Sequence, residues 1–109
     1  MSIPLLHGLA DFSKAYDGFI LDIWGVIHQG GDAYREAIDC VRQLRAAGKR
    51  VIFLSNAPRR AEKVASILEE KGIVRALYDG VLSSGEAARI AFKTGDTAVI
   101  GKLGKRYFL

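Results

Sequence analysis

The chain has 109 residues, half of them hydrophobic, and its 16 Lys and Arg against 12 Asp and Glu give a formal net charge of +4. This length suffices for one small domain, and no apolar run reaches the ~20 residues that a membrane-spanning helix needs. The basic residues are interspersed with acidic ones, so we expect neither nucleic acid nor a membrane as a partner. We expect no secretory signal in the first twelve residues, and the single Cys40 indicates a reduced thiol, as expected of a cytoplasmic protein.

The first predicted strand covers residues 18–24 and is mostly apolar on both faces, as in a parallel sheet that is covered on both sides. A glycine-rich loop follows, and Asp32 is the expected N-cap of a helix over residues 33–47. Gly48 supplies its C-terminal stop. Apolar side chains at steps of three and four residues should face the sheet: Tyr34, Ile38, Val41 and Leu44.

The second strand is predicted over residues 51–54. Pro58 suits the first turn of the next helix, which should end near Lys71, just before Gly72. Its inward side chains are expected to be Val64, Ile67 and Leu68.

The third strand is predicted over residues 80–83. Ser83 and Glu86 have the spacing of a capping box, which predicts a helix from this point to about Lys93. A fourth strand is expected over residues 97–100, and the last nine residues give no clear prediction.

This alternation predicts an α/β fold: a three-layer Rossmann-like core with a parallel sheet. In such open sheets, ligands bind beyond the carboxyl ends of the strands. Asp22 lies near the end of the first strand, Ser55-Asn56 closes the second, and Ser83-Ser84 closes the third. Three polar clusters should therefore gather at one edge.

A carboxylate at that edge can act as a nucleophile toward phosphorus or as a metal ligand. Gly25 would let backbone N–H groups approach a phosphate oxygen, and the Ser55 hydroxyl could donate to another. Amides of Asn56 and of the residues that open the next helix would add positive charge. The residues alone leave a second interpretation equally open, in which Asp22 only bonds a turn and Ser55-Asn56 only caps a helix.

The segments "FILDIWGVIHQG", "VIFLSNAPRR" and "YDGVLSSGEAA" together resemble the haloacid dehalogenase-like hydrolase superfamily. More narrowly, they are similar to its class IIA, nitrophenylphosphatase-like branch, whose members hydrolyse small phosphomonoesters with Mg²⁺. The resemblance covers residues 16–108. It implies a small phosphorylated metabolite as the partner of this chain.

The resemblance also implies roles for individual positions. Asp22 matches the nucleophile, which forms an aspartyl-phosphate and binds Mg²⁺. Trp24 stands where the family gives a backbone carbonyl to the metal, and usually a second Asp as general acid. Gly25 matches the glycine whose amide contacts phosphate, and Ser55 and Asn56 match the second motif.

Two departures from the family pattern stand out. Trp24 cannot donate a proton, a loss typically worth about 10²–10⁴-fold in rate. His28 is one candidate to supply the proton instead, although an ordinary exposed loop histidine is the preferred interpretation. For Trp24 itself, packing under a neighbouring segment is preferred over stacking on substrate.

The family's third and fourth motifs, which bring a lysine and further acidic metal ligands, have no match in residues 1–109. We therefore expect these residues to be the N-terminal part of a core domain without a cap domain, with little or no activity alone. Incomplete coverage of the sheet would favour association into a homo-oligomer.

Other functions remain open. A non-catalytic phosphate- or partner-binding protein on the same scaffold is the main alternative, and Trp24 favours it. A receiver-like phosphoacceptor domain fits less well, because it needs a further acidic pair near the first strand. A dinucleotide-binding domain fits least, because "GVIHQGG" lacks the G-x-G-x-x-G spacing.

Overall fold

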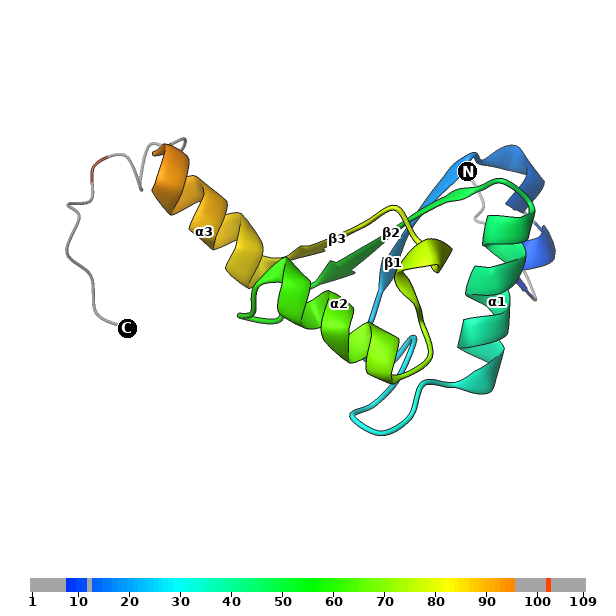
Figure 1. Ribbon diagram of the computed structural model, residues 1–109. Coiled ribbons are helices and arrows are strands. Elements are labelled where there is room, and N and C mark those ends of the chain that lie inside the picture. Colours follow the sequence, from blue (N-terminus) through cyan, green and yellow to red (C-terminus); the bar gives the residue numbers. More distant parts are fainter. Residues whose placement is uncertain (1–7, 12, 96–101, 103–109) are drawn as a thin grey trace, which may run out of the picture.

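The computed structural model describes residues 8–11, 13–95 and 102, and the predicted strand over residues 97–100 lies outside them. Within this part the chain alternates between strands and helices, as predicted (Figure 1). Three short 3₁₀ turns are added to this pattern. In chain order the elements are η1 (Leu9–Asp11), η2 (Ser13–Ala15), β1 (Gly18–Asp22), α1 (Arg35–Ala46), β2 (Arg50–Ser55), α2 (Ala61–Glu70), η3 (Arg75–Leu77), β3 (Gly80–Ser83) and α3 (Ser84–Thr94).

The three described strands form one parallel sheet in the order β1-β2-β3. Asp22 pairs with Leu54, and Ser55 pairs with Ser83, so the three carboxyl ends lie at one edge. The α/β class and the parallel sheet are confirmed. The register explains how residues more than 60 positions apart in sequence meet at one site.

Helices α1 and α2 pack on the same face of the sheet, as expected for two successive crossovers of one hand. Val51 and Phe53 of β2 are completely buried beneath them. The predicted helix faces are largely right, since Val41, Leu44, Val64 and Leu68 are buried, but Tyr34 is 38% exposed. This layer holds the core of the described chain.

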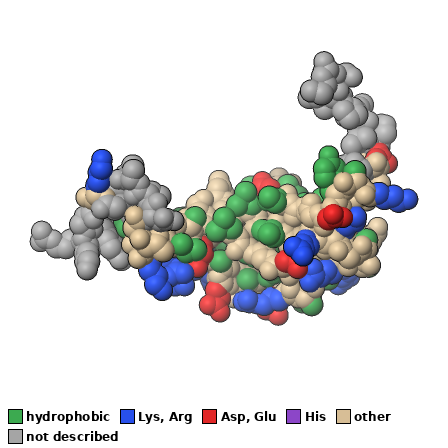
Figure 2. Space-filling view, turned by 90° about the horizontal axis from the view of Figure 1, so that it is seen from above, with side chains coloured by type: hydrophobic (Ala, Val, Ile, Leu, Met, Phe, Trp, Pro, Cys, Tyr) green, Lys and Arg blue, Asp and Glu red, His purple; other side chains and the backbone are tan. Residues whose placement is uncertain are grey.

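The opposite face of the sheet is open among the described residues, so β1 is not covered on both sides as predicted. The alternate side chains of the strands point to this face, and Ile20 is 72% exposed. Ile52, Leu54 and Leu82 are also more than one third exposed. Figure 2 shows hydrophobic side chains gathered in the middle of one face of the molecule, with charged side chains mostly along its border. We call Ile20, Ile52, Leu54 and Leu82 the open face.

Helix α3 continues directly from β3 and projects beyond the helical layer (Figure 1). It buries no side chain completely. The serine half of the predicted capping box is confirmed, because the Ser83 hydroxyl accepts the Glu86 N–H at 3.1 Å. The helix ends at Gly95 in the left-handed conformation, which suits glycine best.

Several predicted boundaries were wrong by a few residues. β1 ends at Asp22 rather than residue 24, because the Ile23 carbonyl accepts the N–H groups of Val26 and Ile27 and so starts a turn. Asp32 does not cap α1. The N-cap is Tyr34, whose N–H donates to the Ile27 carbonyl at 2.7 Å and so fixes the entry into the helix.

Helix α2 likewise begins later than predicted. Pro58 lies in a bend, and the N-cap is Arg60 in an extended conformation. Gly48 and Gly72 have φ angles of 76° and 98°, so both helices end at left-handed glycines as expected.

The amino end of the sheet is closed by Asp79. One carboxylate oxygen of Asp79 accepts the Val51 N–H at 2.8 Å and an Arg45 N–H at 2.9 Å. These bonds, the backbone one first, lower the pKa of Asp79. The end of α1 is thereby tied to the starts of β2 and β3.

None of the described helices is long and apolar enough to cross a bilayer.

Candidate active site at the carboxyl edge

Asp22 is the last residue of β1, and its side chain lines a cavity of about 670 Å³ at the carboxyl edge of the sheet. Ser55, Asn56, Ser83 and Ser84 line the same cavity, so the three predicted polar clusters do meet. The cavity continues onto the open face through Ile20, Leu54 and Leu82. Its wall is therefore polar at the strand ends and apolar along the sheet.

The Asp22 carboxylate keeps most of its hydrogen-bonding capacity. Its Oδ1 accepts the N–H of Ile23 at 2.8 Å, and this is the only hydrogen bond that the described residues give it. No described cation pairs with it. A carboxylate that lines a cavity with one oxygen uncommitted has the geometry required of a nucleophile or a metal ligand.

Gly25 is placed less favourably than the resemblance implies. Its φ of 80° confirms the need for glycine, but its N–H donates to the His28 carbonyl at 2.8 Å. Gly25 does not line the Asp22 cavity. A phosphate contact from this amide would require the bond to His28 to open.

Trp24 lines two cavities, as Ser55 and Asn56 also do. It lines the Asp22 cavity and also a second one of about 440 Å³, which lies between the loop after β1 and α2. Its side chain is 61% exposed, so the expected packing role is limited to an edge contact with His28, with ring centroids 5.7 Å apart.

His28 is buried, and the interpretation of an exposed loop histidine was wrong. Its Nδ1 accepts the N–H of Gly30 at 2.8 Å. Burial first, and then the charge of Lys71, lower the pKa of His28, which favours the neutral form of the ring. Lys71 itself donates to the carbonyls of Gly30 and Gly31. An imidazole whose neutral form is favoured and whose Nδ1 already accepts a bond is poorly suited to the general-acid role that the resemblance leaves open at Trp24.

The Ser55 hydroxyl accepts the Ala57 N–H at 3.2 Å. This bond orders the start of the loop after β2 and leaves the hydroxyl proton free to be donated. The first amide of α2 was expected to face an anion from outside. Instead, the Ala61 N–H lies 3.5 Å from a carboxylate oxygen of Glu86. The negative charge at the N-terminus of α2 is therefore supplied by a side chain of the protein itself.

The sequence pattern gave the Glu86 side chain a capping role, whereas its bonds among the described residues go to Arg60, Ala61 and Arg89. The side chain of Glu86 pairs with Arg60 at 2.8 Å and with Arg89 at 3.0 Å. The Arg89 bonds, followed by the Arg60 bond, lower the pKa of Glu86 to about 2. The pairing with Arg60 joins residues 26 positions apart, and no local sequence signal indicates it.

The donor set at the cavity fits Mg²⁺ only in part. The Asp22 carboxylate and the carbonyl of Trp24 are hard oxygen donors, and Mg²⁺ is often held by one or two carboxylates with water and phosphate. No group of three or more His, Cys, Asp or Glu residues that could hold a metal exists within residues 8–11, 13–95 and 102. The described residues would therefore hold Mg²⁺ weakly unless water and substrate completed its coordination.

Comparison with known proteins agrees with this geometry. The family model described as haloacid dehalogenase-like hydrolase matches residues 19–107. A crystal structure of a hydrolase of the haloacid dehalogenase-like family from Brucella suis 1330 matches with a TM-score of 0.71 and 33% sequence identity. The match covers 80% of this chain and 33% of the Brucella chain, so our chain spans about a third of that relative.

No curated protein matches the chain. The family model nevertheless spans most of the sequence, and the match is consistent with the class IIA branch. The chain therefore belongs to the haloacid dehalogenase-like hydrolase family.

Proposed function

We propose that this chain carries the nucleophile of a Mg²⁺-dependent phosphatase that hydrolyses small phosphomonoesters through an aspartyl-phosphate at Asp22. One observation carries the proposal: Asp22 ends β1 and lines one cavity with Ser55 and Asn56, the hydroxyl and amide groups that would hold a phosphoryl group. Family membership supports the reaction type.

The cytoplasm is the proposed location, since Cys40 is a free thiol.

In the proposed reaction the free oxygen of Asp22 attacks phosphorus, and the bond from phosphorus to the alcohol oxygen breaks. The alcohol leaves with the bonding electron pair and takes up a proton, which here comes from solvent because Trp24 has none to give. Water then attacks the phosphorus of the acyl phosphate, releasing phosphate and restoring the carboxylate of Asp22. Mg²⁺, when bound, would neutralise charge that develops on the phosphoryl oxygens.

We further propose that the 109-residue chain alone turns over phosphomonoesters slowly or not at all. The Asp22 cavity contains one carboxylate, and the described residues bring no lysine into it. Charge on the phosphoryl group would thus be poorly compensated.

The test uses beryllofluoride with Mg²⁺, which mimics a phosphoryl group on a carboxylate. We expect a bound ¹⁹F NMR resonance in the unmodified chain and its loss in Asp22→Asn. Asp17→Asn is the matched control, because Asp17 is exposed and lies before β1, outside the cavity. Equal binding to the unmodified chain and to Asp22→Asn would exclude the nucleophile role.

Turnover of p-nitrophenyl phosphate with Mg²⁺ tests the expected inactivity separately. Clear turnover that Asp22→Asn abolishes would contradict inactivity and support the chemistry.

A non-catalytic phosphate-binding function is the second candidate, and the replacement of the usual acid by Trp24 favours it. A plain binding protein would bind inorganic phosphate without needing the carboxylate of Asp22. Phosphate affinity that is unchanged in Asp22→Asn, together with no beryllofluoride signal, would favour this second function.

A further inference from the structure

The loop between β2 and α2 is bonded to the junction of β3 and α3. The Ser83 hydroxyl donates to the Arg59 carbonyl, and the N–H of Gly85 donates to the Ala57 carbonyl at 3.1 Å. Ser83 is 1% exposed, so its bond is shielded from water. The loop that carries Asn56 is thus held by its backbone at two points.

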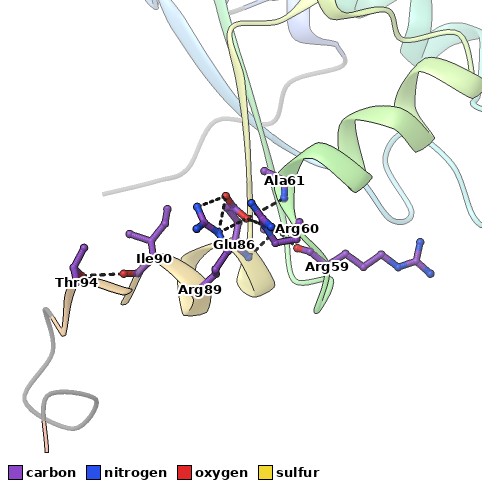
Figure 3. A network of polar contacts seen from close by, with 8 residues as sticks. Arg59, Arg60, Ala61, Glu86, Arg89, Ile90 and Thr94 are labelled. Carbon is purple, nitrogen blue, oxygen red and sulfur yellow. Dashed lines mark hydrogen bonds and ion pairs between the residues drawn. The ribbon is translucent and has the colours of Figure 1, made fainter. Parts of the chain in front are cut away.

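The side chain of Glu86 adds a third and a fourth point. It accepts a hydrogen bond from Arg60 Nε at 2.8 Å, and the Ala61 N–H lies 3.5 Å from the same oxygen. Figure 3 shows these groups converging on Glu86, while the Arg59 side chain points away from them. The Glu86 side chain is only 15% exposed, against 61% for Arg60. Charged hydrogen bonds to a largely shielded carboxylate fix geometry better than fully exposed ion pairs do.

Gly85 allows this close approach. A Cβ atom at Gly85 would lie 2.5 Å from the backbone nitrogen of Arg59 and 2.7 Å from the carbonyl carbon of Pro58. Both are backbone atoms, so a side chain at Gly85 would force the loop itself to move. Glycine is required here by the neighbouring loop, not by its own φ angle.

We propose that Gly85 and Glu86 are positioning residues, which hold the loop after β2 so that Ser55 and Asn56 face the phosphoryl group. The inference rests on the proposed function. It adds a dependence that the family motifs do not contain: the phosphate-binding loop takes its shape from the third strand and its helix. Ser55 is included because its hydroxyl accepts the Ala57 N–H, and Ala57 is itself bonded to Gly85.

The main experiment measures the affinity for inorganic phosphate by NMR titration of the ¹⁵N-labelled chain. Glu86→Gln keeps the size of the side chain and removes its charge, and we expect about two- to fivefold weaker binding. Arg60→Ala should give a similar loss, and the double variant should lose no more than the larger single effect. Glu86→Asp, which keeps the carboxylate, should recover part of the loss.

Arg89→Ala is the matched control, because it removes the other ion pair of Glu86 within α3 and leaves the bond to Arg60. We expect less than a twofold change in phosphate affinity.

Gly85→Ala should weaken phosphate binding about tenfold or more, since it displaces the loop backbone. If Gly85→Ala does not fold, the Glu86 and Arg60 variants still test whether the loop after β2 is positioned from α3.

Amide hydrogen exchange of residues 56, 57 and 59–61 is the second readout and needs no ligand; Pro58 has no amide hydrogen. Glu86→Gln should accelerate exchange of these amides while the amides of α1 stay unchanged. If the unmodified chain binds neither beryllofluoride nor phosphate, the proposed function fails; whenever phosphate does not bind, the exchange data alone decide whether Gly85 and Glu86 position the loop. Unchanged exchange and unchanged affinity in Glu86→Gln would overturn the inference and leave the proposed function standing.

Discussion

The two ends of the sheet each carry a carboxylate, and the two are used differently. At the amino end, Asp79 accepts hydrogen bonds from Arg45 and from the backbone of β2. At the carboxyl end, Asp22 accepts one bond, from the next residue along the chain, and faces a cavity. A carboxylate with several partners contributes to stability, whereas one that is left available can do chemistry. The variants below test this distinction, from the largest expected effect to the smallest.

Asp22→Asn should abolish beryllofluoride binding, a loss of at least about a hundredfold, because an amide cannot replace the nucleophilic oxygen. The thermal midpoint Tm should change little, since the one bond that the described residues give this side chain comes from the Ile23 N–H, and an amide oxygen can accept it. ¹⁹F NMR and thermal denaturation measure the two effects. A large fall in Tm would show that Asp22 is mainly structural.

Asp79→Asn should have the reverse effect. The negative partner of the Arg45 ion pair becomes a neutral amide, which weakens the bonds from Arg45 and Val51, and Tm should fall by several degrees, measured by circular dichroism. Phosphate affinity at a temperature where the variant is folded should be unchanged, because Asp79 lies at the far end of the sheet. Weaker phosphate binding in this variant would mean that the two ends are coupled.

Ser83→Ala should destabilise the chain by about 1–2 kcal/mol, because it removes a helix cap and leaves the Arg59 carbonyl without its partner. Ser84→Ala, at the exposed neighbouring position, should cost less than about 0.5 kcal/mol. Urea denaturation of both variants gives the difference. Equal losses would indicate that burial of Ser83 has no energetic consequence.

Acid should weaken the β3–α3 junction. The folded pKa of Glu86 is lowered to about 2, so its contribution to stability is complete above the unfolded value near 4.5 and is lost as pH falls toward 2. Urea unfolding at intervals between pH 5 and 2 should show this loss, and Glu86→Gln should flatten the profile. An identical profile in both chains would contradict the ion pairs.

The open face should make the chain associate at high concentration, because four apolar side chains are left exposed there among the described residues. Leu54→Lys, on this face, should reduce association with little loss of stability, as measured by sedimentation velocity. Lys63→Met, on the exposed side of α2, is the control and should leave association unchanged. A chain that stays monomeric at all concentrations would remove this expectation.

The element order and the meeting of Asp22, Ser55 and Ser83 could be predicted from sequence, because apolar runs and glycine stops are local signals and parallel strands align their ends. The exact ends could not. The turn after Asp22 depends on the Ile23 carbonyl, and the start of α1 depends on a bond between Tyr34 and Ile27. Both are contacts with no residue-type signature.

The site could be predicted in its residues but not in its bonding. That Gly25 N–H is engaged by His28, and that His28 is buried, follow from the path of one loop. The pairing of Glu86 with Arg60 crosses 26 residues and exists only because β3 lies beside β2. Such tertiary contacts are set by the fold as a whole.

Trp24 is the only tryptophan in the chain, and it lines both cavities at the carboxyl edge. Its indole is largely exposed, so its ultraviolet emission should respond to whatever enters either space. The residue that stands where the proposed reaction would need an acid thus gives the site a built-in optical probe, and ligands can be screened on the unlabelled chain.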